Sequence, residues 1–162
     1  MKNLKFVIDV ISLKPETVWG ISSHWGEITI GDFSERFVIP LDSWTLKDYY
    51  QQWLGAAERI KTYNVSCFVI SAQNLMMNKD TYTLVETWTI YKEGGNVFVH
   101  NNLFNGAMLL ELNLFNFDVK SSYQLVESYH RERFTADGEK ISEWAIYLDD
   151  VISWLENKKH LY

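Results

Sequence analysis

The chain has a single cysteine, Cys67, so it cannot form an intramolecular disulfide. The residues around it, 65–70, are uncharged and largely apolar, without the positive charge that activates a thiol, so we expect Cys67 in the core. Proline occurs only twice, and no low-complexity tract or linker marks a domain boundary. We therefore expect one domain, residues 1–162, which is long enough to fold without a disulfide or a structural metal.

Positive charge is also scarce, because 15 Lys and Arg residues face 21 Asp and Glu residues and the net charge is −6. Proteins that bind nucleic acid directly usually carry a basic excess, so that class is disfavoured. No apolar stretch approaches the ~20 residues that cross a membrane. Lys2 and Lys5 precede an apolar run, but Asp9 interrupts it and no small-residue cleavage site follows. We therefore expect a cytoplasmic protein that contacts neither nucleic acid nor membrane.

The sequence lacks the common catalytic motifs, including the phosphate loop, the dinucleotide fingerprint, the nucleophile elbow, HExxH and paired CxxC. The histidines, at 24, 100, 130 and 160, share no spacing typical of metal ligands, and we expect His24 and His160 to be solvated. Glu86 and Glu143 lie beside aromatic residues in predicted strands. Each could be a tuned general acid, or could pair with Arg or Lys or lie at a strand edge. We expect no catalytic, cofactor or metal site, and hence no enzyme.

Hydrophobic residues make up 47% of the chain and aromatic residues 15%, which is typical of a globular protein. Most of the rings should lie in the core, but Tyr and Trp are also favoured at binding surfaces. An alternative function is therefore a small-ligand-binding protein or enzyme, with a pocket lined by aromatic residues such as Trp88, Phe98 and Trp144.

Residues 46–62 show the clearest helical periodicity. Apolar side chains recur along one face at Leu46, Tyr49, Tyr50, Trp53, Leu54, Ala57 and Ile60. Thr45 precedes the first turn and Asp48 follows three residues later, a spacing close to that of a capping box. The sequence predicts an amphipathic helix that packs on a sheet through a face containing Trp53.

Short β-branched and aromatic runs predict strands, within 1–11 and at 17–22, 27–30, 36–39, 65–71, 82–91, 96–103, 131–135 and 140–148. Turns are predicted at 24–26, 31–34, 92–95, 105–106 and 136–138. Residues 107–117 suit a strand or a short helix, and a last helix should begin at Asp149 or Asp150. The predicted class is α+β, a mainly antiparallel sheet of about seven to nine strands with two principal helices packed on it.

Four segments carry a resemblance to a known family: YYQQWLGAAERI at 49–60, CFVI at 67–70, WTIYKEGGNVFV at 88–99 and DGEKISEW at 137–144. In this order they resemble the immunity proteins of bacterial contact-dependent growth inhibition systems, over roughly residues 43–155. The resemblance implies a cytoplasmic protein that binds the C-terminal toxin domain delivered by a neighbouring cell. It implies that binding blocks the toxin's active site or its access to substrate. Many such toxins are nucleases, often acting on tRNA.

The resemblance supplies no motif for toxin contacts, so candidate residues come from charge and position. A nuclease must approach phosphates and is usually basic, and an acidic inhibitor could be steered towards it. Exposed carboxylates near predicted turns are the candidate toxin contacts, namely Asp32, Glu35, Glu93 and Asp137. Each of them could equally be a solvated turn residue.

Overall fold

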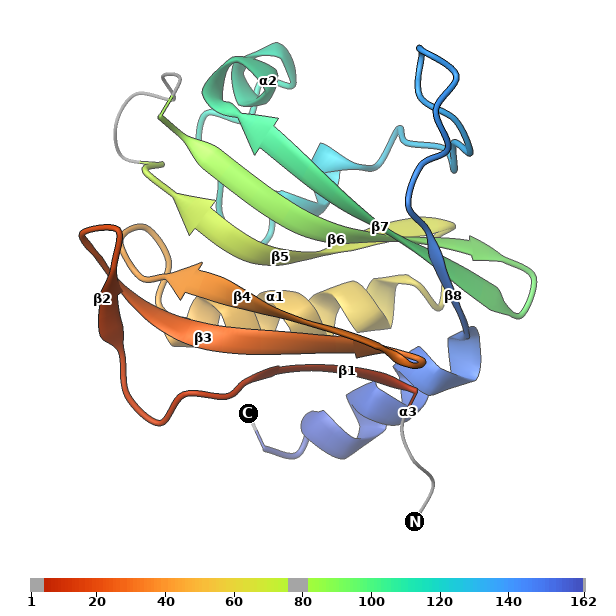
Figure 1. The fold of residues 1–162 in the computed structure, drawn as a ribbon, viewed down its shortest axis with the longest axis horizontal. Helices are drawn as coiled ribbons and strands as arrows, with labels where there is room; N and C mark the ends of the chain where they lie inside the picture. Colours follow the sequence, from red (N-terminus) through yellow and green to blue (C-terminus); the bar gives the residue numbers. More distant parts are fainter. Residues whose placement is uncertain (1–4, 76–81, 162) are drawn as a thin grey trace.

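The computed structural model describes residues 5–75 and 82–161. These residues form eight strands, three α-helices and one short 3-10 helix, which confirms the predicted α+β class (Figure 1). In chain order the elements are β1 (Phe6–Val10), β2 (Glu16–Val18), β3 (Ile21–Ile30), β4 (Phe33–Pro40), α1 (Leu46–Arg59), β5 (Val65–Gln73), β6 (Leu84–Glu93), β7 (Asn96–Asn105), α2 (Gly106–Glu111), η1 (Ser122–Leu125), β8 (Trp144–Tyr147) and α3 (Leu148–Lys158).

The strands form two four-stranded antiparallel sheets rather than one. In the first sheet β3 is central, with β1 and β2 paired along one edge and β4 along the other. The second sheet has the order β5-β6-β7-β8. Strands β4 and β5 contact one another where the two sheets meet (Figure 1).

The predicted turn at 24–26 is wrong, because these residues lie inside β3. Gly26 is needed there since an added Cβ would lie 2.4 Å from a ring carbon of Phe37 on the paired strand. His24 is buried rather than solvated, and its Nδ1 lies 2.9 Å from the Oγ of Ser12. The chain turns instead at Trp19–Gly20, which divides the predicted strand 17–22 into β2 and β3.

Helix α1 confirms the predicted periodicity and cap. The Oγ1 of Thr45 accepts a hydrogen bond from the amide of Asp48 (3.2 Å), and the Asp48 carboxylate accepts one from the amide of Thr45 (2.8 Å). This is the reciprocal pair of a capping box. The Trp53 side chain is only 1% exposed, so the predicted phase of the helix is correct.

Side chains of α1 satisfy the edge of β5 that faces away from β6. The Gln52 amide donates to the carbonyl of Cys67 and accepts from the amide of Val69, both at 2.8 Å. The indole of Trp53 donates to the Val69 carbonyl (2.7 Å). The Tyr49 hydroxyl accepts from the Ala72 amide (2.9 Å) and donates to the carbonyl of Pro40 (2.8 Å), which links β5 to the end of β4. The helix thus supplies hydrogen bonds that a neighbouring strand would otherwise provide.

The core lies where the sheets, α1 and α3 meet. The ring of Phe6 on β1 lies 5.2 Å from that of Phe68 on β5, and both contact Trp154 of α3 edge-on. The Trp154 indole also donates to the Ile8 carbonyl (3.2 Å), which fixes α3 on β1. Cys67 is fully buried as predicted, and burial raises the pKa of its thiol to about 12, so the thiol stays protonated and unreactive.

The C-terminal half departs most from the predicted elements. The segment 107–117 begins as the short helix α2, and Asn105, predicted as a turn residue, is its N-cap. Of the strands predicted at 131–135 and 140–148, only an isolated bridge between Phe134 and Lys140, and β8, are formed. Helix α3 begins at Leu148, with both predicted capping aspartates in its first turn. None of the described helices is long and apolar enough to cross a membrane.

Candidate functional site

The four carboxylates predicted to contact a partner lie in different surroundings. Asp32 is exposed in the β3–β4 turn, beside a hollow that Lys5 and Asn96 also line. Glu35 is exposed on β4 and faces a groove between the two sheets. Glu93 is exposed at the end of β6, where it contacts Arg131, and Asp137 is exposed in the turn before β8. Their exposure agrees with the prediction, but the structure gives them no common site.

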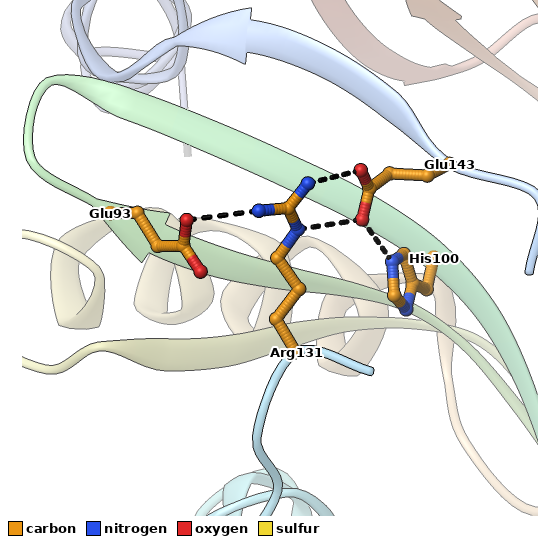
Figure 2. Close-up of polar contacts among 4 residues, drawn as sticks. All are labelled: Glu93, His100, Arg131 and Glu143. Carbon is orange, nitrogen blue, oxygen red and sulfur yellow. Dashed lines mark hydrogen bonds and ion pairs between the residues drawn. The ribbon is translucent and has the colours of Figure 1, made fainter. Parts of the chain in front are cut away.

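Glu93 belongs to a polar cluster that we call the Arg131 clasp, formed by Glu93, His100, Arg131 and Glu143 (Figure 2). The guanidinium of Arg131 binds both carboxylate oxygens of Glu143, with its Nε 2.7 Å from Oε2. Its Nη1 donates to Glu93 at 2.9 Å. The Nε2 of buried His100 lies 2.7 Å from the Oε2 of Glu143. The clasp therefore joins the irregular segment before β8 to β6 and β7.

The hydrogen bonds of the clasp stabilise the ionised forms of both Glu143 and Arg131. The hydrogen bonds that Arg131 donates lower the pKa of Glu143 to about 2, and the same bonds raise the pKa of Arg131. The guanidinium carbon also lies 3.4 Å from the centroid of the Phe98 ring, a cation–π contact. Pairing with Arg, one of the alternatives for Glu143, is thus confirmed. Because Glu143 stays ionised and both its oxygens are engaged, it is poorly suited to act as a general acid.

Glu86 has a different environment, in the groove between the sheets. The groove has a volume of about 260 Å³, and its lining includes Trp19, Trp25, Glu35, Phe37, Leu84 and Glu86. The Glu86 carboxylate accepts a hydrogen bond from the Asn101 amide (3.0 Å). Burial raises the pKa of Glu86, and the nearby charge of Glu35 raises it further. Within the described residues, no Lys, Arg or His forms an ion pair with either carboxylate.

The aromatic residues expected to line a ligand pocket are packed against other side chains instead. Trp88 is buried, and the centroid of its ring lies 5.5 Å from that of Trp144. The ring of Phe33 stacks on Trp144 at 4.4 Å, and Phe98 lies under Arg131. The rings of Phe33, Trp88 and Trp144 pack together between β4, β6 and β8, whereas Phe98 lies on the other face of the sheet. The three named residues therefore contribute to packing rather than to a common cavity.

The histidines do not gather into a site either. His24 and His100 are buried on different sheets, whereas His130 and His160 are exposed, the latter as predicted. Across 5–75 and 82–161, no three His, Cys, Asp or Glu side chains are grouped so that they could hold a metal ion.

Sequence reasoning missed two functional candidates. Arg131 falls in a predicted strand, and nothing in the sequence marks it as functional, because its partners Glu93 and Glu143 are 38 and 12 residues away. Trp19 was assigned to a strand, although a following glycine is a recognisable turn signal. The structure places Trp19 at an exposed hairpin tip beside the groove.

Comparison with known proteins adds independent information. Residues 39–154 match the family model described as the CdiI N-terminal domain. The immunity protein CdiI of Enterobacter cloacae subsp. cloacae is 30% identical over 142 residues, which cover 87% of this chain and 90% of that protein. A solved structure described as the CdiA-CT/CdiI toxin and immunity complex from Enterobacter cloacae matches with a TM-score of 0.79 and 27% identity, over 96% of this chain and 99% of that chain.

The family model thus covers more than half of the chain, and the similar protein and the similar fold extend over most of its length. The four segments in 49–144 that resemble immunity proteins all lie inside the matched region, so that prediction is confirmed. The chain belongs to the CdiI family of immunity proteins from contact-dependent growth inhibition systems.

Proposed function

We propose that this chain binds and neutralises the C-terminal toxin domain of its cognate contact-dependent growth inhibition system. The observation that carries the proposal is the match of nearly the whole fold to a chain from a solved toxin and immunity complex. The 30% identity to an immunity protein over 87% of this chain supports the same function. The protein acts in the cytoplasm of the cell that makes it, where the incoming toxin would meet its substrate.

The proposed inhibition is stoichiometric rather than catalytic. This proposal is supported by two groups that could otherwise act as a general acid or base. Arg131 holds Glu143 ionised, and the ring of His100 is buried against Glu143. The remaining activity of a fixed amount of toxin should fall linearly with added protein and reach zero near a 1:1 ratio. Complete neutralisation by a small fraction of an equivalent would instead indicate an enzyme that modifies the toxin.

The functional test is protection of living cells. The toxin domain encoded by the gene directly upstream should be expressed from an inducible promoter, with and without this protein. Growth should continue only when the protein is present, whereas an immunity protein from an unrelated system should fail to protect. Growth arrest despite the protein's presence at equal or higher level would refute the function.

We further propose that the toxin is a nuclease, with tRNA as the first substrate to examine. The net charge of −6 supports this, because an acidic inhibitor suits an enzyme built to approach phosphates. Total RNA and DNA from intoxicated cells should show cleaved tRNA, and the cleavage should disappear when the protein is coexpressed. Intact nucleic acids in arrested cells would refute the nuclease assignment and leave the immunity function standing.

Asp32, Glu35, Glu93 and Asp137 remain the proposed carboxylate contacts. Because they lie in different surroundings, each should be reversed to Lys separately and the association rate with the toxin measured. Glu93 differs from the others, since its carboxylate is already engaged by Arg131. A residue whose reversal leaves association unchanged lies outside the interface.

A further inference from the structure

The tip of the β2–β3 hairpin carries a tryptophan where folding alone would not favour one. Trp19 and Gly20 form a two-residue turn with φ of 48° and 80°. A turn with positive φ at both positions favours Asn or Asp before Gly, because an L-residue with a bulky side chain is strained there. The Trp19 side chain is also 84% exposed, so it gains little from burial in the folded chain. Strain and exposure at one residue suggest a function outside the fold.

Trp19 borders the groove that contains Glu35 and Glu86. Most of the remaining lining is apolar and includes Phe37, Leu84 and the half-buried Trp25. A second hollow, lined by Ile11 and Ser12, adjoins it and shares the residues Trp25 and Arg36. The hairpin tip borders the groove, and the shared residues Trp25 and Arg36 join the groove to the second hollow. Figure 1 shows β2 at one side of the molecule.

The charges in the groove determine what kind of group would fit it. Glu86 is partly desolvated beside Glu35, and neither has an ion-pair partner among the described residues. Arg36 also lines the groove, but its Nε is directed to Glu27 at 3.4 Å. A cationic side chain placed in the groove would relieve the repulsion between the two carboxylates and would be shielded by the aromatic lining.

We propose that this surface docks the toxin domain, with Trp19 as the apolar anchor and an Arg or Lys side chain of the toxin between Glu35 and Glu86. The proposal rests on the immunity function proposed above and specifies where and how the toxin is held. A large aromatic residue beside a paired charge is the composition typical of a binding hot spot. A role in toxin binding also explains why residue 19 is a tryptophan, although asparagine would fit this turn better.

The decisive variant is Trp19→Asn, which separates folding from binding. Asn tolerates positive φ, so the variant should be at least as stable as the wild-type protein in urea unfolding. Its affinity for the purified toxin domain, measured by calorimetry, should fall about tenfold or more, as for a hot-spot residue. The matched control is Phe134→Ala, which removes a ring that is 59% exposed in the loop before β8, on the opposite side of the fold (Figure 1). The control should bind as the wild-type protein does.

The charge arm uses Glu35→Gln and Glu86→Gln, which keep the side-chain shape and remove the charge. Each should weaken toxin binding several-fold, and the double variant should show a weaker dependence of affinity on salt. Tight toxin binding that persists unchanged in Trp19→Asn and in the double variant would overturn this surface and leave the proposed function intact. If the wild-type protein neither binds the toxin nor protects cells, both the proposed function and the proposed docking surface are refuted.

Discussion

At the scale of the residue, Gln52 illustrates how one polar side chain can complete a sheet edge. It is fully buried, and its amide exchanges hydrogen bonds with the Cys67 carbonyl and the Val69 amide. Gln52→Ala would leave both groups without these bonds away from water, at a cost of about 1–3 kcal/mol for each. We expect a loss of about 3 kcal/mol in the free energy of unfolding, measured by urea denaturation. The neighbouring exposed Gln51→Ala is the matched control and should change stability by less than about 0.5 kcal/mol.

Trp53 combines the same hydrogen-bonding role with packing. Its ring contacts Phe37 of the first sheet, and its indole donates to the Val69 carbonyl of the second. Trp53→Ala should lower the free energy of unfolding by about 3–5 kcal/mol, as large aromatic truncations in a core do. A loss below about 1 kcal/mol in the same denaturation experiment would contradict the observed burial.

Local sequence patterns predict the burial of Trp53 but not that of Gln52. The burial of Trp53 follows from helical periodicity, because every position on one face of an amphipathic helix experiences the same environment. Gln52 is as deeply buried, yet a glutamine in a helical pattern gives no sign of it, since its partners are backbone groups 15 and 17 residues away. His24 is predicted to be solvated because Gly26 is a local turn signal, but the structure places both in β3, where the ring of Phe37 on β4 leaves room only for glycine at position 26.

At the scale of the element, the Arg131 clasp holds a segment that has little regular structure. Between η1 and β8 the only described pairing is the bridge between Phe134 and Lys140. The clasp connects this segment to β6 and β7 through Glu93 and His100. Long irregular segments remain ordered only when such contacts offset their conformational entropy.

The clasp should make stability depend on acid pH. The pKa of Glu143 is lowered to about 2 by Arg131 in the folded protein, below its ordinary value of 4.5. Its contribution is therefore fully present above about pH 5 and is lost as the pH falls from about 5 to about 2. Glu143→Gln should reduce the free energy of unfolding on the order of 2 kcal/mol at pH 7. The difference between variant and wild type should shrink as the pH falls. Two curves that stay parallel from pH 7 to pH 2 would show that Glu143 is not responsible.

The elements that sequence predicted well are those set by local chemistry. The capping box, the amphipathic face of α1 and the β6–β7 hairpin all depend on residues within a few positions of one another. The Arg131 clasp depends on contacts between residues 12 to 43 positions apart, which no spacing rule encodes. The division into two sheets depends on strand pairing that no local pattern specifies. The exposure of Asp32, Glu35, Glu93 and Asp137 was predictable, but their separation on the surface required the fold.

At the scale of the whole molecule, the arrangement suits the proposed inhibition, in which the protein must be folded and ready before the toxin arrives. Tyr49 and Trp53 of α1 each contact both β4 and β5, so buried side chains join the two sheets. A rigid surface loses little conformational entropy on binding, which favours affinity. The acidic side chains at the surface can then attract a positively charged partner by long-range electrostatics.

With a net charge of −6, the molecule should attract a basic toxin domain before the two surfaces touch, which raises the association rate. Salt screens exposed charges over about 10 Å at 0.1 M, so the rate constant for association should fall on the order of tenfold between about 0.02 and about 0.5 M NaCl. Stopped-flow fluorescence of the tryptophans can measure it. The dissociation rate should change much less, because it reflects the contacts already formed in the complex. An association rate that is flat across this range would mean that the acidity serves solubility rather than long-range attraction of the toxin.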